Sequence, residues 1–165
     1  MTTTRKPNPF IKYIYLGSFL LVTAVIFFFS LTNGTDSSQQ SNFFRDIVVN
    51  SLDFFGITLT PDQVDLIGLL IRKLIGHLGI FAVDGLFGFL TFYDFLKIEK
   101  TILCSLILSL VLMLLIAFVS EGMQFLVPDR GPALVDVTID FSGALIAILI
   151  LFLIKHRQLK KEKAV

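Results

Sequence analysis

Residues 101–119 read TILCSLILSLVLMLLIAFV, a run without a single charged side chain. A membrane-spanning helix needs roughly 20 predominantly apolar residues, and this run is long enough to be one. Three further runs have the same character: residues 13–31, which are also uncharged, residues 74–96, which carry His77, Asp84 and Asp94, and residues 133–154, which carry Asp136 and Asp140. The sequence therefore predicts an all-α polytopic membrane protein built as a bundle of four transmembrane helices.

The composition leaves little room for a soluble domain. Of 165 residues, 55% are hydrophobic, 18 are phenylalanine, and the mean hydropathy is +0.82. We therefore interpret residues 1–165 as one integral membrane domain. The single Cys104 lies inside the third predicted span, so no disulfide can form within the chain.

The positive charges are distributed unevenly although the net charge is only +1. Four predicted spans place ten of the 14 basic residues on one side of the membrane: Arg5, Lys6, Lys12, Lys97, Lys100, Lys155, Arg157, Lys160, Lys161 and Lys163. The positive-inside rule then predicts a multi-pass membrane protein with both termini cytoplasmic. Residues 33–72 and 120–132 would face outward, and the basic tail would contact anionic membrane lipids rather than nucleic acid.

The segment between the first two spans contains a second kind of helix. A polar Ser/Gln run at 35–41 is typical of a flexible linker, and Asn33-Gly34 indicates a turn. The residues that follow place apolar side chains on one helical face: Phe43, Phe44, Ile47, Val48, Leu52 and Phe55. This short outer amphipathic helix either lies on the outer leaflet or caps the bundle, and the sequence leaves both possibilities open.

A helix start is predicted at Thr60-Pro61-Asp62-Gln63. Thr60 is a suitable N-cap, Pro61 suits the first helical position, and Gln63 completes a capping box. We expect this helix to continue into the second span, with a bend near Gly76 and Gly79.

Polar side chains recur at helical spacing near the predicted outer ends of the spans. Lys73 and His77 are four residues apart, as are Asp136 and Asp140, and Glu121 and Gln124 are three apart, so each pair shares a face. Arg72 and Arg130 lie beside these pairs. Charged groups near a bilayer are costly and are usually functional or tightly paired.

Three interpretations of this polar group remain open. Ion pairs could fix the register of the helices, the group could form a functional pocket, or His77 could bind a metal with nearby carboxylates. No ligand spacing specifies a metal, and neither a metal nor a cofactor is predicted. A proton- or ion-coupled carrier that uses His77, Asp84 and Asp140 is disfavoured by the small number of spans and by the lack of an internal repeat.

These residues resemble the conserved blocks of the VanZ-like family of small bacterial membrane proteins, over roughly residues 13–154. The matching blocks are Phe29-Ser30 followed by Ser37-Ser38 and Ser41, Arg72-Lys73 with His77, Glu121-x-x-Gln124 with Pro128 and Arg130, and Asp136-Val137-x-x-Asp140-x-x-Gly143.

The chain departs from the family pattern in the second block. The family has Arg-Lys-x-x-His, whereas one extra residue, which we assign to Gly76, separates Lys73 from His77 here. The acid and the tyrosine that usually follow the histidine are replaced by Ile80 and Phe81. We hypothesise that Asp84, one turn further along the same face, restores the missing carboxylate.

The resemblance implies a cell-envelope protein linked to low-level resistance to teicoplanin-type glycopeptides. We expect an outward-facing polar pocket that binds or modifies a lipid-linked or cell-wall component, and the partner that the resemblance suggests is either a lipid-linked cell-wall precursor or a glycopeptide. The candidate catalytic residues are Glu121 and His77, and the candidate ligand-binding residues are Arg72, Lys73, Gln124, Arg130, Asp136 and Asp140. An Arg130–Asp136 ion pair is the structural alternative for those two residues.

The alternative function is a non-catalytic membrane interaction or scaffold protein whose polar cluster is structural. The sequence does not decide whether the protein is an enzyme or what its oligomeric state is.

Overall fold

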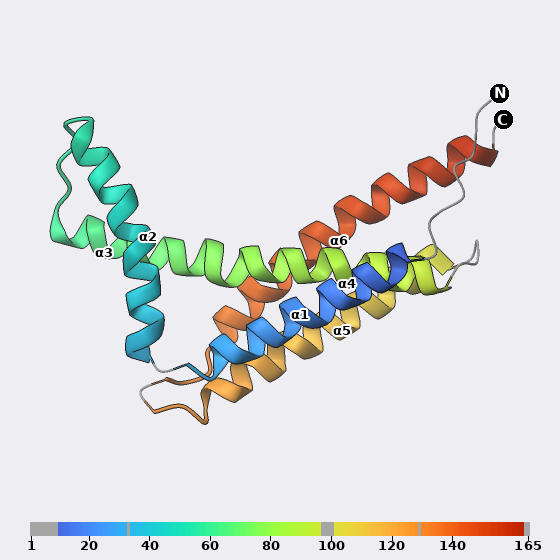
Figure 1. Cartoon of the computed structure of the whole chain (residues 1–165), viewed down its shortest axis with the longest axis horizontal. Helices are drawn as coiled ribbons and strands as arrows, with labels where there is room; N and C mark the ends of the chain where they lie inside the picture. Colours follow the sequence, from blue (N-terminus) through green and yellow to red (C-terminus); the bar gives the residue numbers. More distant parts are fainter. Residues whose placement is uncertain (1–9, 33, 97–100, 129, 164–165) are drawn as a thin grey trace.

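The computed structural model describes residues 10–32, 34–96, 101–128 and 130–163, and these form helices without any strand (Figure 1). The elements are α1 (Ile11–Ser30), α2 (Gly34–Phe54), α3 (Pro61–Ile71), the π-helix η1 (Arg72–Gly79), α4 (Ile80–Leu96), α5 (Thr101–Gln124) and α6 (Leu134–Lys163). Helices α3, η1 and α4 follow one another without a break. Arg5, Lys6, Asn33, Lys97, Lys100 and Asp129, which the sequence-based predictions use, lie outside the described residues.

Four helices are long and apolar enough to cross a membrane, as the sequence predicts. They are Ile11–Ser30, Pro61–Leu96, Ile102–Gln124 and Leu134–Glu162. Each differs from its predicted apolar run, and the largest difference is in the second, which begins at Pro61 rather than at residue 74. The third continues to Gln124, so Glu121 and Gln124 belong to the end of a helix, as their spacing predicts.

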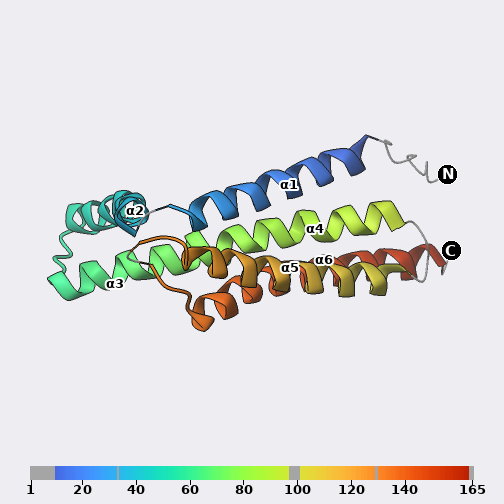
Figure 2. The same cartoon turned by 90° about the horizontal axis from the view of Figure 1, so that it is seen from below.

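The four spans run lengthwise in one bundle (Figure 2). Because successive spans alternate in direction, the second span and α6 run parallel. Two contacts between η1, in the second span, and α6 join residues with the same separation in the chain, Lys73 to Asp136 and His77 to Asp140. Helix α1 begins and α6 ends at one end of the bundle, and α2 and α3 lie at the other (Figure 1). We call the second end the α2–α3 end.

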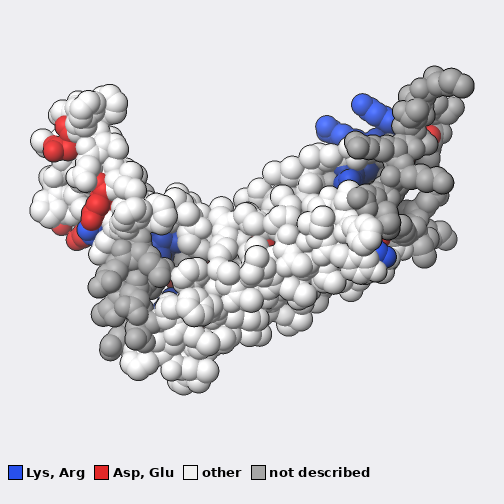
Figure 3. Space-filling model, in the orientation of Figure 1, with Lys and Arg blue, Asp and Glu red and all other residues white. Residues whose placement is uncertain are grey.

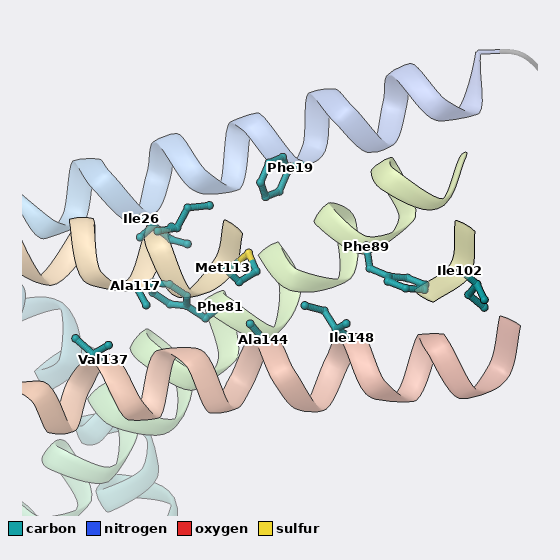
Figure 4. Packing of buried hydrophobic residues seen from close by; sticks show 11 residues of the cluster. Phe19, Ile26, Phe81, Phe89, Ile102, Met113, Ala117, Val137, Ala144 and Ile148 are labelled. Atoms are coloured by element: carbon teal, nitrogen blue, oxygen red, sulfur yellow. The ribbon is translucent and has the colours of Figure 1, made fainter. Parts of the chain in front are cut away.

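The core runs along the bundle axis and receives side chains from every span (Figure 4). Phe89, Met113, Ala144 and Ile148 are fully buried within it. Many other large apolar side chains on the spans are exposed at the bundle surface, for example Leu115 at 55%. Such an apolar exterior is stable only in contact with lipid, which agrees with a membrane-spanning bundle.

Helix α1 is held to α4 by small residues and one polar contact. The ring of Phe19 lies 3.2 Å from where a Cβ would sit on Gly88, so a larger residue at 88 would push this ring away. One turn further along α1, the Thr23 hydroxyl donates to both oxygens of the fully buried Asp84, at 3.0 and 3.2 Å. Asp84 therefore fastens α1 to α4 in the middle of the bundle.

The turns around α3 follow the local chemistry of the chain. The predicted capping box is confirmed: the Gln63 backbone N–H donates to the Thr60 hydroxyl, and the Thr60 backbone N–H donates to the Gln63 side chain at 2.9 Å. Helix α2 ends where Gly56 adopts a positive φ of 79°. The N–H of Ile57 then donates to the carbonyl of Leu52, which is the Schellman arrangement that glycine permits at a helix end.

The linker prediction for residues 35–41 is wrong, because the α2 helix begins at Gly34 and includes them. Glutamine is a good helix former and serine a tolerable one, so the polar run can extend the amphipathic segment that follows it. Helix α2 packs against α3 and lies across the bundle direction (Figure 1). Its predicted apolar face does not cap the bundle: Phe43, Phe44 and Ile47 are about half exposed or more.

Candidate functional site

The polar residues of the second block lie on η1, the π-helical segment from Arg72 to Gly79. A π-helix forms i→i+5 hydrogen bonds, so each turn holds one residue more than an α-helical turn, and such segments are frequent at functional sites. The extra residue between Lys73 and His77 is accommodated in this way. The predicted bend near Gly76 and Gly79 takes the form of this wider turn.

The pair Lys73 and His77 meets the pair Asp136 and Asp140 at the contact between η1 and α6. Lys73 Nζ lies 2.5 Å from Asp136 Oδ1, and His77 Nδ1 lies 3.0 Å from Asp140 Oδ1. The close approach depends on Gly143, because a Cβ there would overlap the backbone carbonyl of Leu78. Two of the predicted ligand-binding carboxylates are therefore engaged with the helix that faces them.

Glu121 is buried, and one of its carboxylate oxygens holds the loop between α5 and α6 while the other contacts Gln124 of its own helix. Its Oε1 accepts the backbone N–H of Ala133 at 2.5 Å, and its Oε2 accepts from Gln124 Nε2 at 2.8 Å. Ala133 directly precedes the first turn of α6, where a negative charge is favourable for the helix dipole. No direct contact joins Glu121 to His77 among the described residues, whereas Asp140 does contact His77.

Arg130 ties the same loop to α1. Its NH1 group donates to the carbonyls of Phe29 and Thr32 at 3.1 and 3.0 Å, at the C-terminal end of that helix. This is a favourable place for a cation. Partial burial lowers the pKa of Arg130. The Glu121 carboxylate raises this pKa, and the positive charge of neighbouring Arg72 lowers it further. The guanidinium remains charged, since arginine does not lose its proton in proteins.

A cavity of about 270 Å³ lies at the α2–α3 end. It is lined by both predicted arginines, by the histidine and by part of the carboxylate and amide set: Arg72, His77, Gln124, Arg130 and Asp140. Apolar residues from α1, α2, α3, η1 and α4 complete the wall. Lys73, Glu121 and Asp136 do not line it.

The charges that face the cavity are unequally paired. Neither Arg72 nor Arg130 forms an ion pair with a carboxylate among the described residues, and the Nε and NH2 groups of Arg130 make no hydrogen bond there. Asp140, in contrast, is occupied by His77. The cavity therefore offers guanidinium donors without matching acids, which is the arrangement that binds a carboxylate or a phosphate.

His77 has one nitrogen held and one available. An ionised carboxylate only accepts hydrogen bonds, so with Asp140 ionised the contact places the ring proton of His77 on Nδ1. Nε2 makes no hydrogen bond with the described residues and is then the basic nitrogen of the neutral ring. A histidine oriented in this way by a carboxylate is able to take up or deliver a proton.

The structure thus brings together most, but not all, of the predicted residues. Arg130 does not pair with Asp136, whose partner is Lys73. Asp84 contacts α1 rather than the cavity. The two serines that line the cavity, Ser30 and Ser120, were not predicted as site residues, and each donates its hydroxyl to a carbonyl of its own helix. Within the described ranges, no group of three or more His, Cys, Asp or Glu residues is arranged to hold a metal ion.

The comparison with known families decides the assignment. The family model described as VanZ/LLP1 matches residues 14–155, which is most of the chain. The chain belongs to the VanZ/LLP1 family. No curated protein and no solved structure matches it.

The arrangement gives a physical meaning to the VanZ-like blocks of this chain. Glu121, Gln124 and Arg130 hold the α5–α6 loop and join it to α1, whereas Asp136 and Asp140 hold η1 against α6. Gly143 permits the close approach of these two elements. The blocks are far apart in the sequence, yet together they build the cavity wall.

Proposed function

We propose that this VanZ/LLP1 protein resides in the bacterial cytoplasmic membrane with both termini in the cytoplasm and the cavity on the outer side. The distribution of charge supports this orientation. Lys and Arg gather at the end where α6 finishes, and acidic side chains gather on α2 and α3 (Figure 3). Basic residues favour the cytoplasmic side of membrane proteins.

We propose further that the cavity binds the anionic group of a lipid-linked or cell-wall component. The observation that carries this proposal is the pair of guanidiniums, Arg72 and Arg130, which reach the cavity without a carboxylate partner among the described residues. Gln124 supplies an amide beside them, and the Lys73–Asp136 pair holds η1 against α6 without lining the cavity.

The cavity size limits what it encloses. Pockets that bury a drug-sized molecule measure roughly 300–1,000 Å³, and this one measures about 270 Å³. A glycopeptide antibiotic is several times larger than such molecules. A link to teicoplanin resistance, which the family resemblance implies, would therefore act through an envelope component and not through enclosure of the drug.

If the ligand is modified as well as bound, His77 is our candidate for proton transfer. Asp140 is the carboxylate that orients it, at 3.0 Å. In this proposal Glu121, which the resemblance suggests as a catalytic residue, serves to position the loop that carries Arg130, since its two oxygens are occupied by Ala133 and Gln124.

Teicoplanin susceptibility of a sensitive Gram-positive host tests the proposal. The host would express the wild type, Arg72→Gln or Arg157→Gln, with vancomycin measured alongside and membrane levels checked. Arg157 is an exposed arginine at the opposite end of the bundle and serves as the matched control. We expect protection from the wild type and from Arg157→Gln but not from Arg72→Gln. Equal protection by all three would show that the function does not depend on the cavity. Protection by none would show that the resistance phenotype does not extend to this chain.

A non-catalytic interaction protein remains the second candidate because of one observation. Phe54 and Phe55, at the end of α2, are 85% and 77% exposed and lie away from the cavity. A scaffold that uses this surface would lose its phenotype in a Phe54→Ser, Phe55→Ser variant and keep it in Arg72→Gln. The cavity proposal expects the reverse.

A further inference from the structure

We infer that the occupant of the cavity is a lipid phosphate whose hydrocarbon chain enters sideways from the membrane, between α1 and η1. This inference rests on the proposed anion-binding function and names the class of ligand. The alternative source of the same chemistry is a water-soluble phosphate that enters from the aqueous side.

The depth of the cationic groups matches that of lipid head groups. Ile80, the first residue of α4, lies 16 residues before Leu96, which corresponds to about 24 Å along an α-helix that rises 1.5 Å per residue. His77 and Arg72 lie three and eight residues further along the π-helix η1, which rises less per residue, so they lie at most about 28 and 36 Å from Leu96. The hydrocarbon core of a bilayer is about 30 Å thick. If Leu96 marks the opposite surface, His77 lies near the hydrocarbon boundary and Arg72 lies at the level of the phosphates.

The cavity mouth is apolar and faces outward from the bundle. Phe29, Phe44 and Ile75 line the cavity, yet they are 40%, 49% and 58% exposed. They come from α1, α2 and η1, and so surround one opening. Their exposed surfaces continue the apolar exterior of the spans, which is the face that contacts lipid chains. A soluble anion would gain nothing from such a rim.

The packing of the helices explains why the opening lies there. Helix α1 packs along α4 and α5, and η1 packs along α6, but α1 and η1 have no comparable contact among the described residues. Arg130, which bonds the end of α1, and Arg72, on η1, both line the cavity. A phosphate between them would receive donors from both while its chain stays in the leaflet.

The test uses the full chain in nanodiscs of phosphatidylcholine, with calorimetric titration of dodecyl phosphate and ethyl phosphate and with empty nanodiscs as the partitioning control. Three variants are compared with the wild type: Arg72→Gln, Ile75→Gln and Leu74→Gln. Leu74 is the matched control for Ile75, because it is a neighbour of similar exposure, 54%, that does not line the cavity.

We expect dodecyl phosphate to bind the wild type more tightly than ethyl phosphate by at least about tenfold, because its chain buries apolar surface at the mouth. Ile75→Gln should remove most of this chain-length gain, Leu74→Gln should keep it, and Arg72→Gln should weaken both ligands. Equal binding of the two phosphates, or an unchanged gain in Ile75→Gln, would overturn the sideways-entry inference while leaving the anion site intact. No binding of either phosphate would overturn the proposed function as well.

Discussion

The two sides of η1 differ sharply although they belong to the same eight residues. The side toward α6 is closed: Lys73 and His77 each contact an aspartate, and the Leu78 carbonyl lies against Gly143. The side toward α1 is open: Arg72 has no acidic partner among the described residues and faces a cavity. Charge near a membrane is thus paired for assembly on one side, and on the other side it lacks an acidic partner among the described residues.

This difference shows which substitutions separate folding from function. A change on the closed side should lower stability, because it leaves a buried partner unsatisfied or separates η1 from α6. A change on the open side should leave stability unaltered and remove binding. The predictions below test this division, and they begin with the largest expected effect on the fold.

Deletion of one residue should be far more harmful in α4 than in η1. Deleting Val83 would rotate the two parts of the long helix relative to each other by about 100°, which would separate the Asp84–Thr23 contact from the His77–Asp140 contact. Deleting Gly76 should convert the wider turn into α-helix and restore the family spacing, with Lys73 and His77 still on one face.

We expect folded protein from the Gly76 deletion and little or none from the Val83 deletion, as measured by monodispersity in detergent and by circular dichroism. An equal loss of folded protein in both deletions would show that the π-helix does not arise from the insertion of a single residue.

Gly143→Ala should destabilise the bundle by ~1–3 kcal/mol, which is the usual cost of overpacking. Its new methyl group would meet the Leu78 backbone carbonyl, which cannot rotate away as a side chain could. Gly122→Ala is the control, because no atom lies within 4 Å of the added Cβ at that helical position. Thermal unfolding in detergent should show a lower Tm for Gly143→Ala alone, and a similar Tm for both variants would contradict the close contact.

Much of the fold could be predicted from the sequence, because its signals are local. The length of the apolar runs identifies the spans, and Thr60 with Gln63 identifies a helix start. Spacing also places Lys73 with His77 and Asp136 with Asp140, each on one face. These features need only helical geometry, and the structure contains all of them.

The partners within the site depend on how the helices fit together, which spacing does not reveal. His77 meets Asp140 rather than Glu121 because the π-helical turn and Gly143 set the register of η1 on α6. Glu121 and Arg130 find backbone partners, at Ala133 and at Phe29 and Thr32. Backbone N–H and carbonyl groups occur along the whole chain, so the sequence pattern does not predict which of them bind Glu121 and Arg130.

The two ion pairs of the closed side should differ in strength. Asp140 is almost completely buried, with 2% of its side chain exposed, whereas Lys73 and Asp136 are 27% and 18% exposed. Asp140→Asn should therefore cost ~1.5–3 kcal/mol, as expected for a buried charged hydrogen bond. Asp136→Asn should cost ~1 kcal/mol or less because solvent screens the more exposed pair. Chemical denaturation of both variants measures the difference, and a larger loss for Asp136→Asn would reverse this ranking.

The smallest effect on stability, and the sharpest test of the comparison, is expected from Arg72→Gln. Arg72 is exposed and makes no hydrogen bond with the described residues, so its replacement should change the free energy of unfolding by no more than about 0.5 kcal/mol. Its neighbour Lys73, which carries the same charge on the closed side, is the matched control. Lys73→Gln should lower the Tm and keep phosphate binding, whereas Arg72→Gln should keep the Tm and lose binding. If both variants lost binding equally, the charge of η1 as a whole, rather than the side it faces, would determine the ligand site.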